Sequence, residues 1–235
     1  MSSPIKIIIP ALFTIGNLFF GFLSIVKTAE GDYTTAVLCI LISAFFDLID
    51  GFAARLLKSP TEFGVQLDSL ADITGFGVPV AFLGSNFLFA DLGTYSVFAG
   101  SIFLIAGAVR LARFNAELKG FEKTTFSGMP IPFASITAAV FVLALIENPE
   151  YKIPEITLPV MILLSLLMVS RVKFESSASL LAKSNLIKGI YLIVLLFSIV
   201  LPIMFGIKVL FAIFVAVILF TILSHFAENF RIKNN

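Results

Sequence analysis

Residues 34–57 read TTAVLCILISAFFDLIDGFAARLL, and the first thirteen of these positions carry no charge. A helix that spans a bilayer needs about 20 consecutive, mostly apolar residues. A membrane β-barrel would instead show short segments in which apolar and polar residues alternate. This stretch therefore predicts a transmembrane helix, and it places two aspartates, Asp47 and Asp50, near the end of that helix.

The whole composition agrees with a membrane protein. Of 235 residues, 59% are hydrophobic and 13% are charged, and the mean hydropathy is +1.06. We expect an all-α, polytopic bundle in the cell membrane, in contact with membrane lipids. The net charge of +1 gives no indication of a nucleic-acid partner. One cysteine, Cys39, and one histidine, His225, exclude an intramolecular disulfide and a Cys/His zinc cluster.

Seven further stretches have a similar apolar character. The eight expected spans are 7–27, 34–57, 68–90, 94–114, 130–147, 153–170, 186–205 and 207–227. No internal repeat or low-complexity tract interrupts them, so we expect a single membrane domain over 1–235.

The distribution of lysine and arginine predicts the orientation. With eight spans, both termini lie on one side of the membrane. Thirteen of the sixteen Lys and Arg residues then fall on that side, and Lys27, Lys152 and Lys208 fall on the other. Cytoplasmic loops carry the excess of positive charge, so the termini are expected in the cytoplasm.

Four of the six aspartates lie within 26 residues, at the expected cytoplasmic ends of the second and third spans. They are Asp47, Asp50, Asp68 and Asp72. Spacings of three and four residues place each pair on one helical face. Both spans end on the same side, so all four carboxylates are expected to face a common site.

These carboxylates repel one another, and Arg55 alone cannot neutralise them. A charged residue costs about 2.5–3.5 kcal/mol at the centre of a membrane helix. Carboxylate oxygens suit Mg²⁺ or Mn²⁺. Two such ions about 3.5–4 Å apart could bridge a pyrophosphate during an in-line displacement. Gly51, Ala54 and Gly64 would leave room for a bulky group beside the aspartates.

Two other interpretations use the same residues. Charged groups at helix ends often serve as interfacial anchors, and small residues often serve helix packing. Carboxylates inside a membrane also mark ion pathways, as in a divalent-metal transporter. A transporter site is expected near the bilayer midplane, often between inverted repeats. The aspartates here lie at one edge and no repeat is visible, which favours an enzyme.

The pattern Asp47-x2-Asp50-Gly51-x2-Ala54-Arg55-x8-Gly64-x3-Asp68-x3-Asp72 resembles the signature of the CDP-alcohol phosphotransferases at every specified position. The resemblance implies divalent metal bound by all four aspartates, Asp68 among the catalytic groups, and Asp72 as the base that deprotonates the acceptor alcohol. It also implies a nucleotide pocket at the following residues: Gly51, Ala54, Arg55, Thr61 and Gly64.

Further stretches resemble the branch of this family that uses serine. They are Thr14-x2-Asn17-x3-Gly21, Ser69-Leu-Ala-Asp72 with Phe76-Gly-x-Pro79, Arg110-Leu-Ala-Arg113-Phe-Asn115, and Phe126-x-Gly128-Met-Pro130-x-Pro132. The catalytic core would then occupy about 10–135. The resemblance implies transfer of a phosphatidyl group from a CDP-linked lipid, of the diacylglycerol or archaeol type, to L-serine. It also implies release of CMP, and a homodimer.

Arg110 and Arg113 lie three residues apart and so share a helical face. Arginine binds carboxylates in a bidentate manner, so this pair favours an anionic or zwitterionic acceptor. Serine and glycerol 3-phosphate both satisfy that condition, and a phosphatidylglycerol phosphate synthase stays open as the alternative. Asn17 and Asn115 are further candidates for the acceptor pocket.

Overall fold

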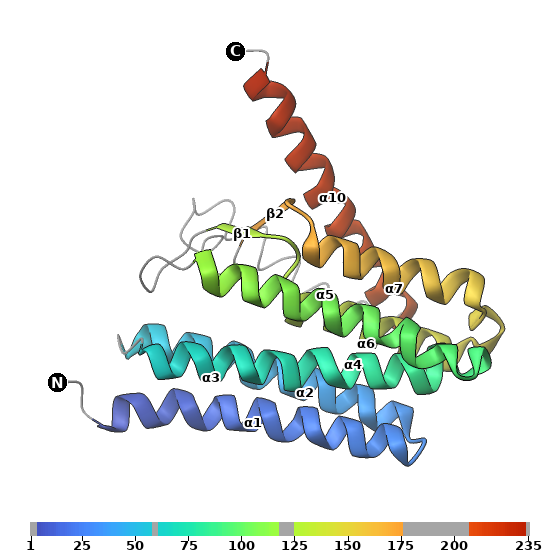
Figure 1. Cartoon of the computed structure of the whole chain (residues 1–235), viewed down its shortest axis with the longest axis horizontal. Coiled ribbons are helices and arrows are strands. Elements are labelled where there is room, and N and C mark those ends of the chain that lie inside the picture. The colour runs from blue at the N-terminus through green and yellow to red at the C-terminus, as the bar shows by residue number, and fades with distance from the viewer. Residues whose placement is uncertain (1–3, 58–60, 118–124, 176–206, 234–235) are drawn as a thin grey trace.

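The computed structural model describes residues 4–57, 61–117, 125–175 and 207–233. They form a helical bundle with one pair of short strands (Figure 1). The elements are α1 (Pro4–Ala29), α2 (Tyr33–Leu56), α3 (Glu62–Asp72), η1 (Ile73–Gly77), α4 (Val78–Leu83), η2 (Gly84–Leu88), η3 (Ala90–Leu92), α5 (Tyr95–Glu117), β1 (Thr125–Ser127), α6 (Ile131–Glu147), η4 (Pro149–Tyr151), α7 (Pro154–Val169), β2 (Lys173–Glu175) and α10 (Ile207–Lys233).

Within the described part of the chain, four helices are long and apolar enough to cross a membrane. They are Ile8–Ala29, Tyr33–Ala54, Glu62–Leu88 and Tyr95–Ala116. Shorter apolar helices cover Ile131–Glu147, Pro154–Val169 and Val209–Leu223. The expected helical membrane fold is confirmed to this extent. The expected span 186–205 lies outside the described residues, and the total of eight stays a prediction.

The third span begins earlier than the sequence suggests. We expected it to start at Asp68, but α3 starts at Glu62, because Thr61 caps it. The Thr61 hydroxyl accepts a hydrogen bond from the Gly64 N–H at 3.0 Å. This bond satisfies a donor that has no partner inside the helix, and the acidic Glu62 suits the positive end of the helix dipole. Asp68 therefore lies in the second turn, not at the helix start.

The same span continues to Leu88 through two π-helical segments, η1 and η2. The first of them begins directly after Asp72. Short π-helical segments inside α-helices frequently occur at functional sites. Here η1 buries Gly75, Phe76 and Gly77, so the chain turns from the aspartates directly into the core of the bundle.

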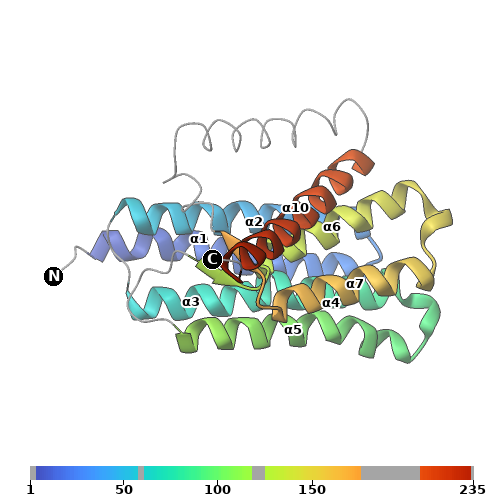
Figure 2. The same ribbon diagram turned by 90° about the horizontal axis from the view of Figure 1, so that it is seen from above.

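The helices α1 to α7 run side by side along the long axis of the molecule, whereas α10 leaves this bundle at a steep angle (Figures 1 and 2). Fully buried side chains from η1, α5, α6 and α7 meet between them. They include Phe76, Phe103, Ile131 and Met168. This core fixes the relative positions of the helices that carry the aspartates and the arginines.

An all-α fold was expected, and the strand pair is the exception. The strands β1 and β2 pair antiparallel, with Phe126 opposite Phe174. Phe174 is buried, so the pairing covers an aromatic ring and also satisfies backbone groups in two segments that lie outside the helices. The strands connect the start of α6 to the end of α7.

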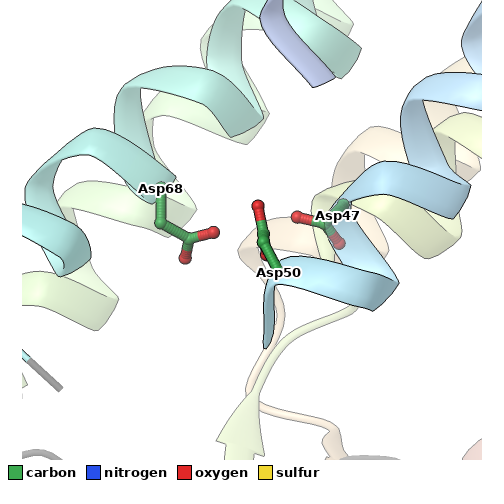
Figure 3. A group of neighbouring side chains, drawn as sticks. All are labelled: Asp47, Asp50 and Asp68. Atoms are coloured by element: carbon green, nitrogen blue, oxygen red, sulfur yellow. The ribbon is translucent and has the colours of Figure 1, made fainter. Parts of the chain in front are cut away.

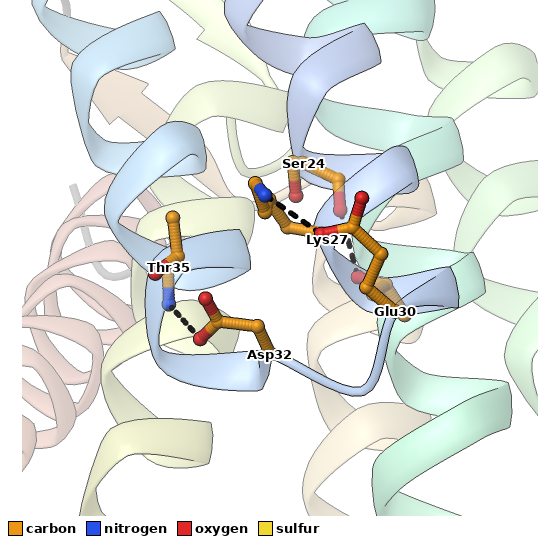
Figure 4. A network of polar contacts seen from close by, with 6 residues as sticks. Ser24, Lys27, Glu30, Asp32 and Thr35 are labelled. Carbon is orange, nitrogen blue, oxygen red and sulfur yellow. Dashed lines mark hydrogen bonds and ion pairs between the residues drawn. The ribbon is translucent and has the colours of Figure 1, made fainter.

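The turn between α1 and α2 lies at the other end of the bundle from the aspartates. Lys27 pairs with Glu30 at 2.7 Å, and Asp32 accepts a hydrogen bond from the Thr35 N–H at 3.1 Å (Figure 4). The hydrogen bonds from Thr35 hold the pKa of Asp32 below its usual range. This exposed network caps α2, and it contains no group that reaches the aspartate cluster.

Candidate active site

Three of the four aspartates form a compact group. Asp47 and Asp50 come from α2 and Asp68 comes from α3, and each offers one oxygen so that the three oxygens lie within 4.8 Å of one another. Figure 3 shows the three carboxylates turned toward one another across the space between the two helices. The aspartates that residue spacing placed at the ends of two neighbouring helices are therefore close together in the structure.

Asp72 lies one turn further along α3 and is 8% exposed. Its carboxyl group lies near that of Asp47 and within the range over which the Arg110 guanidinium attracts it. Asp72 is thus adjacent to the group of three without belonging to it.

The burial of these groups is a test of whether a divalent cation fits. Asp50 is 4% exposed, and within the described residues Asp50 Oδ2 and Asp72 Oδ1 are buried without a hydrogen-bond partner. Asp47 and Asp68 are only partly buried, but two buried carboxylates in such a cluster are costly without positive charge beside them. Oxygen ligands in this number and proximity are what Mg²⁺ or Mn²⁺ prefers. The residues present therefore fit such an ion.

Thr14, on α1, also belongs to this site. Its side chain is buried, and its hydroxyl donates to the Pro10 carbonyl at 3.1 Å while lying near the Asp50 carboxyl group. In the sequence, Thr14 entered only the resemblance and was not expected at the aspartates. Asp50 lies 36 positions further along the chain, so spacing within one helix could not reveal that the two are close.

The expected nucleotide residues surround the end of α2 and the start of α3. Gly51 and Ala54 are partly exposed on α2. A Cβ added to Gly64 would meet only the Thr61 hydroxyl, at 3.1 Å, so the space beside this turn is otherwise open. The Thr61 hydroxyl itself caps α3. Arg55 lies in the last turn of α2, and its side chain is outside the described part.

The structure separates the residues expected in the acceptor pocket. Arg110 is 5% exposed, is near enough to Asp72 for the two charges to attract, and stacks over the Phe114 ring at 5.7 Å. Asn115 is hydrogen-bonded to Ser69 on α3, at 3.1 Å from its Nδ2 to the hydroxyl oxygen. Arg113 donates to backbone carbonyls at the end of α7. Arg110 is thus the arginine brought to the aspartates.

Asn17 is fully buried between α1 and its neighbours. The Ser43 hydroxyl donates to Asn17 Oδ1 at 2.5 Å and also lies 3.1 Å from the Asn17 backbone oxygen. The same hydroxyl is 3.4 Å from the Gly75 carbonyl oxygen. Asn17 therefore connects α1, α2 and η1 directly behind the aspartate cluster.

Ser69 on α3 also lies at this site, although in the sequence it entered only the resemblance and not the expected site residues. It precedes Asp72 by three positions and so shares its helical face. Its hydroxyl exchanges hydrogen bonds with Asn115, 46 residues away. The spacing to Asp72 was the available signal, but the partner on α5 was not visible in the sequence.

These features define a helical membrane protein with an acidic site between α2 and α3 and with α5 beside it. The chain belongs to the CDP-alcohol phosphatidyltransferase family, whose model matches residues 7–172. The expected family is thereby confirmed, and the chain is an enzyme of this type. Family membership also favours the enzyme over the ion transporter considered above.

Several characterised relatives are similar over most of this chain. CDP-diacylglycerol–serine O-phosphatidyltransferase of Helicobacter pylori is 32% identical over 171 residues, which cover 71% of each chain. The protein of the same name from Bacillus subtilis is 36% identical over 167 residues, 71% of this chain and 89% of that one. Archaetidylserine synthase of Methanothermobacter thermautotrophicus is 33% identical over 139 residues, 58% of each.

Proposed function

We propose that this enzyme transfers the phosphatidyl group of a CDP-linked lipid to L-serine and releases CMP. The observation that carries the proposal is the convergence of Asp47, Asp50 and Asp68 oxygens within 4.8 Å, with Asp72 and Arg110 adjacent. The names of the relatives from H. pylori, B. subtilis and M. thermautotrophicus support serine as the acceptor.

Asp47, Asp50 and Asp68 would hold divalent metal, Mg²⁺ or Mn²⁺ and as many as two ions, with Asp72 as a further contact. When bound, the metal would supply positive charge beside the pyrophosphate of the donor and beside the phosphate group of the departing CMP. The nucleotide would lie against the end of α2 and the start of α3. The residues concerned are Gly51, Ala54, Arg55, Thr61 and Gly64.

Asp72 would act as the general base on the acceptor. It takes the proton of the serine hydroxyl while the serine oxygen forms a bond to the phosphorus that carries the lipid. The bond from that phosphorus to the bridging oxygen breaks, and CMP leaves with the electron pair. Arg110 is near enough to Asp72 for the two charges to attract, so a serine carboxylate bound to Arg110 would leave its hydroxyl within reach of Asp72.

The proposal includes the arrangement of the chain in the membrane. The chain would form a single domain with eight spans, with a catalytic core over about 10–135, and would assemble as a homodimer. With eight spans, the termini and the active site would lie on the cytoplasmic side. The lysines and arginines of the described residues support this orientation. Arg55, Arg110, Arg113 and Arg171 lie at the end of the bundle that holds the aspartates, whereas Lys27 and Lys152 lie at the other end.

Release of CMP from CDP-diacylglycerol tests the proposal. Purified enzyme in mixed micelles is given Mn²⁺ or Mg²⁺ with serine, glycerol 3-phosphate or inositol. We expect CMP and phosphatidylserine only with serine, and none with a chelator. Release with glycerol 3-phosphate but not with serine would contradict serine as the acceptor. Full turnover by Asp72→Asn would contradict the role of the base.

A further inference from the structure

Arg113 connects the end of α5 to the end of α7. Its Nη1 donates to the Val169 carbonyl at 2.8 Å and its Nη2 donates to the Ser170 carbonyl at 3.0 Å. The last carbonyls of a helix have no partner inside the helix, and they form the negative end of its dipole. A guanidinium placed there satisfies two of them and is itself held by two charge-assisted bonds.

The turn before α6 completes this connection. Gly128 has φ +85°, a conformation that side chains other than glycine's rarely adopt. Its N–H donates to the Val172 carbonyl at 2.9 Å, and the Met129 N–H donates to the Leu167 carbonyl at 3.0 Å. A Cβ on Gly128 would collide with the Met168 carbonyl oxygen and lie 2.9 Å from Arg113 Nη2. We call these bonds, together with those of Arg113, the α5–α7 contact.

The same segment of α5 also reaches α3. Asn115 is hydrogen-bonded to Ser69, and Arg110 is near enough to Asp72 for the two charges to attract. Residues 110–115 are therefore held from two directions, by α3 at the site and by α7 behind it.

We propose that Arg113 is a positioning residue, which acts through the α5–α7 contact to hold Arg110 and Asn115 against Asp72 and Ser69. Arg110 binds the acceptor carboxylate, and Arg113 does not touch the acceptor. This inference rests on the proposed use of serine. It separates the roles of two arginines that their spacing in the sequence makes equivalent.

Steady-state kinetics of Arg113→Ala, Arg113→Lys and Gly128→Ala test the proposal. Loss of the contact is expected to raise the KM for serine about tenfold, as loss of a hydrogen bond to a charged group does. The KM for the CDP-lipid and kcat at saturating serine stay near those of the wild type. Arg113→Lys keeps a cation at the carbonyls that end α7, so its KM for serine is expected to lie between those of the wild type and Arg113→Ala. Arg171→Ala removes a neighbouring exposed cation and serves as the control.

An acceptor without a carboxylate separates positioning from direct binding. Serinol replaces the carboxylate of serine by a hydroxymethyl group. We expect Arg113→Ala and Gly128→Ala to keep the wild-type ratio of kcat/KM for serine over serinol, and Arg110→Ala to lose it. Loss of that ratio in Arg113→Ala, or an unchanged serine KM in both variants of the contact, would overturn the proposal. Wild-type enzyme that releases no CMP with serine would overturn the proposed function instead, before any variant is compared.

Discussion

Gly21 on α1 and Gly75 in η1 approach each other backbone to backbone. A Cβ added to Gly21 would collide with the Gly75 Cα and lie 2.8 Å from the Thr74 carbonyl oxygen. The contact occurs one turn after Asn17, whose side chain meets Ser43 and the backbone of Gly75. The two glycines thus let α1 close over the segment that directly follows Asp72.

Gly21→Ala is therefore expected to destabilise the enzyme by about 1–3 kcal/mol, the usual cost of forcing extra atoms into a packed interior. The measurement is the temperature at which purified protein in detergent unfolds or aggregates, together with CMP release. Gly84→Ala is the matched control, because a Cβ there makes only ordinary contacts, the nearest at 3.6 Å to Phe89. Equal stability of both variants would show that the close approach is dispensable.

Replacement of the clustered aspartates is expected to change the dependence on metal. Asp47→Asn, Asp50→Asn and Asp68→Asn each remove a charged oxygen from the group of three. Loss of a residue that only hydrogen-bonds to a metal ligand lowers metal affinity or activity roughly 10- to 100-fold. Loss of a ligand itself should therefore lower the affinity for Mn²⁺ or the rate of CMP release by at least that factor. CMP release measured against Mn²⁺ concentration checks this. Asp91→Asn, an exposed aspartate outside the site, should leave the curve unchanged.

The sequence was sufficient for the features that depend on spacing within one helix. Asp47 with Asp50, and Asp68 with Asp72, share faces because helices have a fixed period, and the structure places them as expected. The expected start of α3, at residue 68, was wrong by six residues because the apolar pattern begins later than the cap at Thr61. An N-cap depends on a single side chain, and hydrophobicity does not report it.

Partners distant in the chain could not be predicted. Arg110 and Arg113 have the same chemistry and share a helical face, yet one lies beside Asp72 and the other reaches Val169, 56 residues away. Which partner each arginine meets depends on how α5 packs between α3 and α7. The pairing of Ser69 with Asn115 depends on the same packing. Tertiary contacts of this kind leave no periodic signal in a single sequence.

The hydrogen bonds between Ser69 and Asn115 are expected to act as one unit. Ser69→Ala and Asn115→Ala should each lower stability by about 0.5–1.5 kcal/mol, the typical net contribution of a hydrogen bond. The double variant should cost little more than either single one, because both remove the same bonds. Unfolding of the four proteins in detergent measures this coupling. Ser101→Ala on α5, whose hydroxyl bonds only its own helix at Phe98 in the described contacts, is the control.

The single cysteine makes the orientation testable by labelling. Cys39 is 3% exposed within the bundle, so Cys39→Ala gives a background without reactive thiols. Glu150 and Arg171 are both exposed and lie beyond opposite ends of α7. In that background we expect Glu150→Cys to react with a membrane-impermeant maleimide in intact cells, and Arg171→Cys to react only after the membrane is permeabilised. The reverse pattern would place the aspartates on the outer side of the membrane, away from a cytoplasmic supply of CDP-lipid and serine.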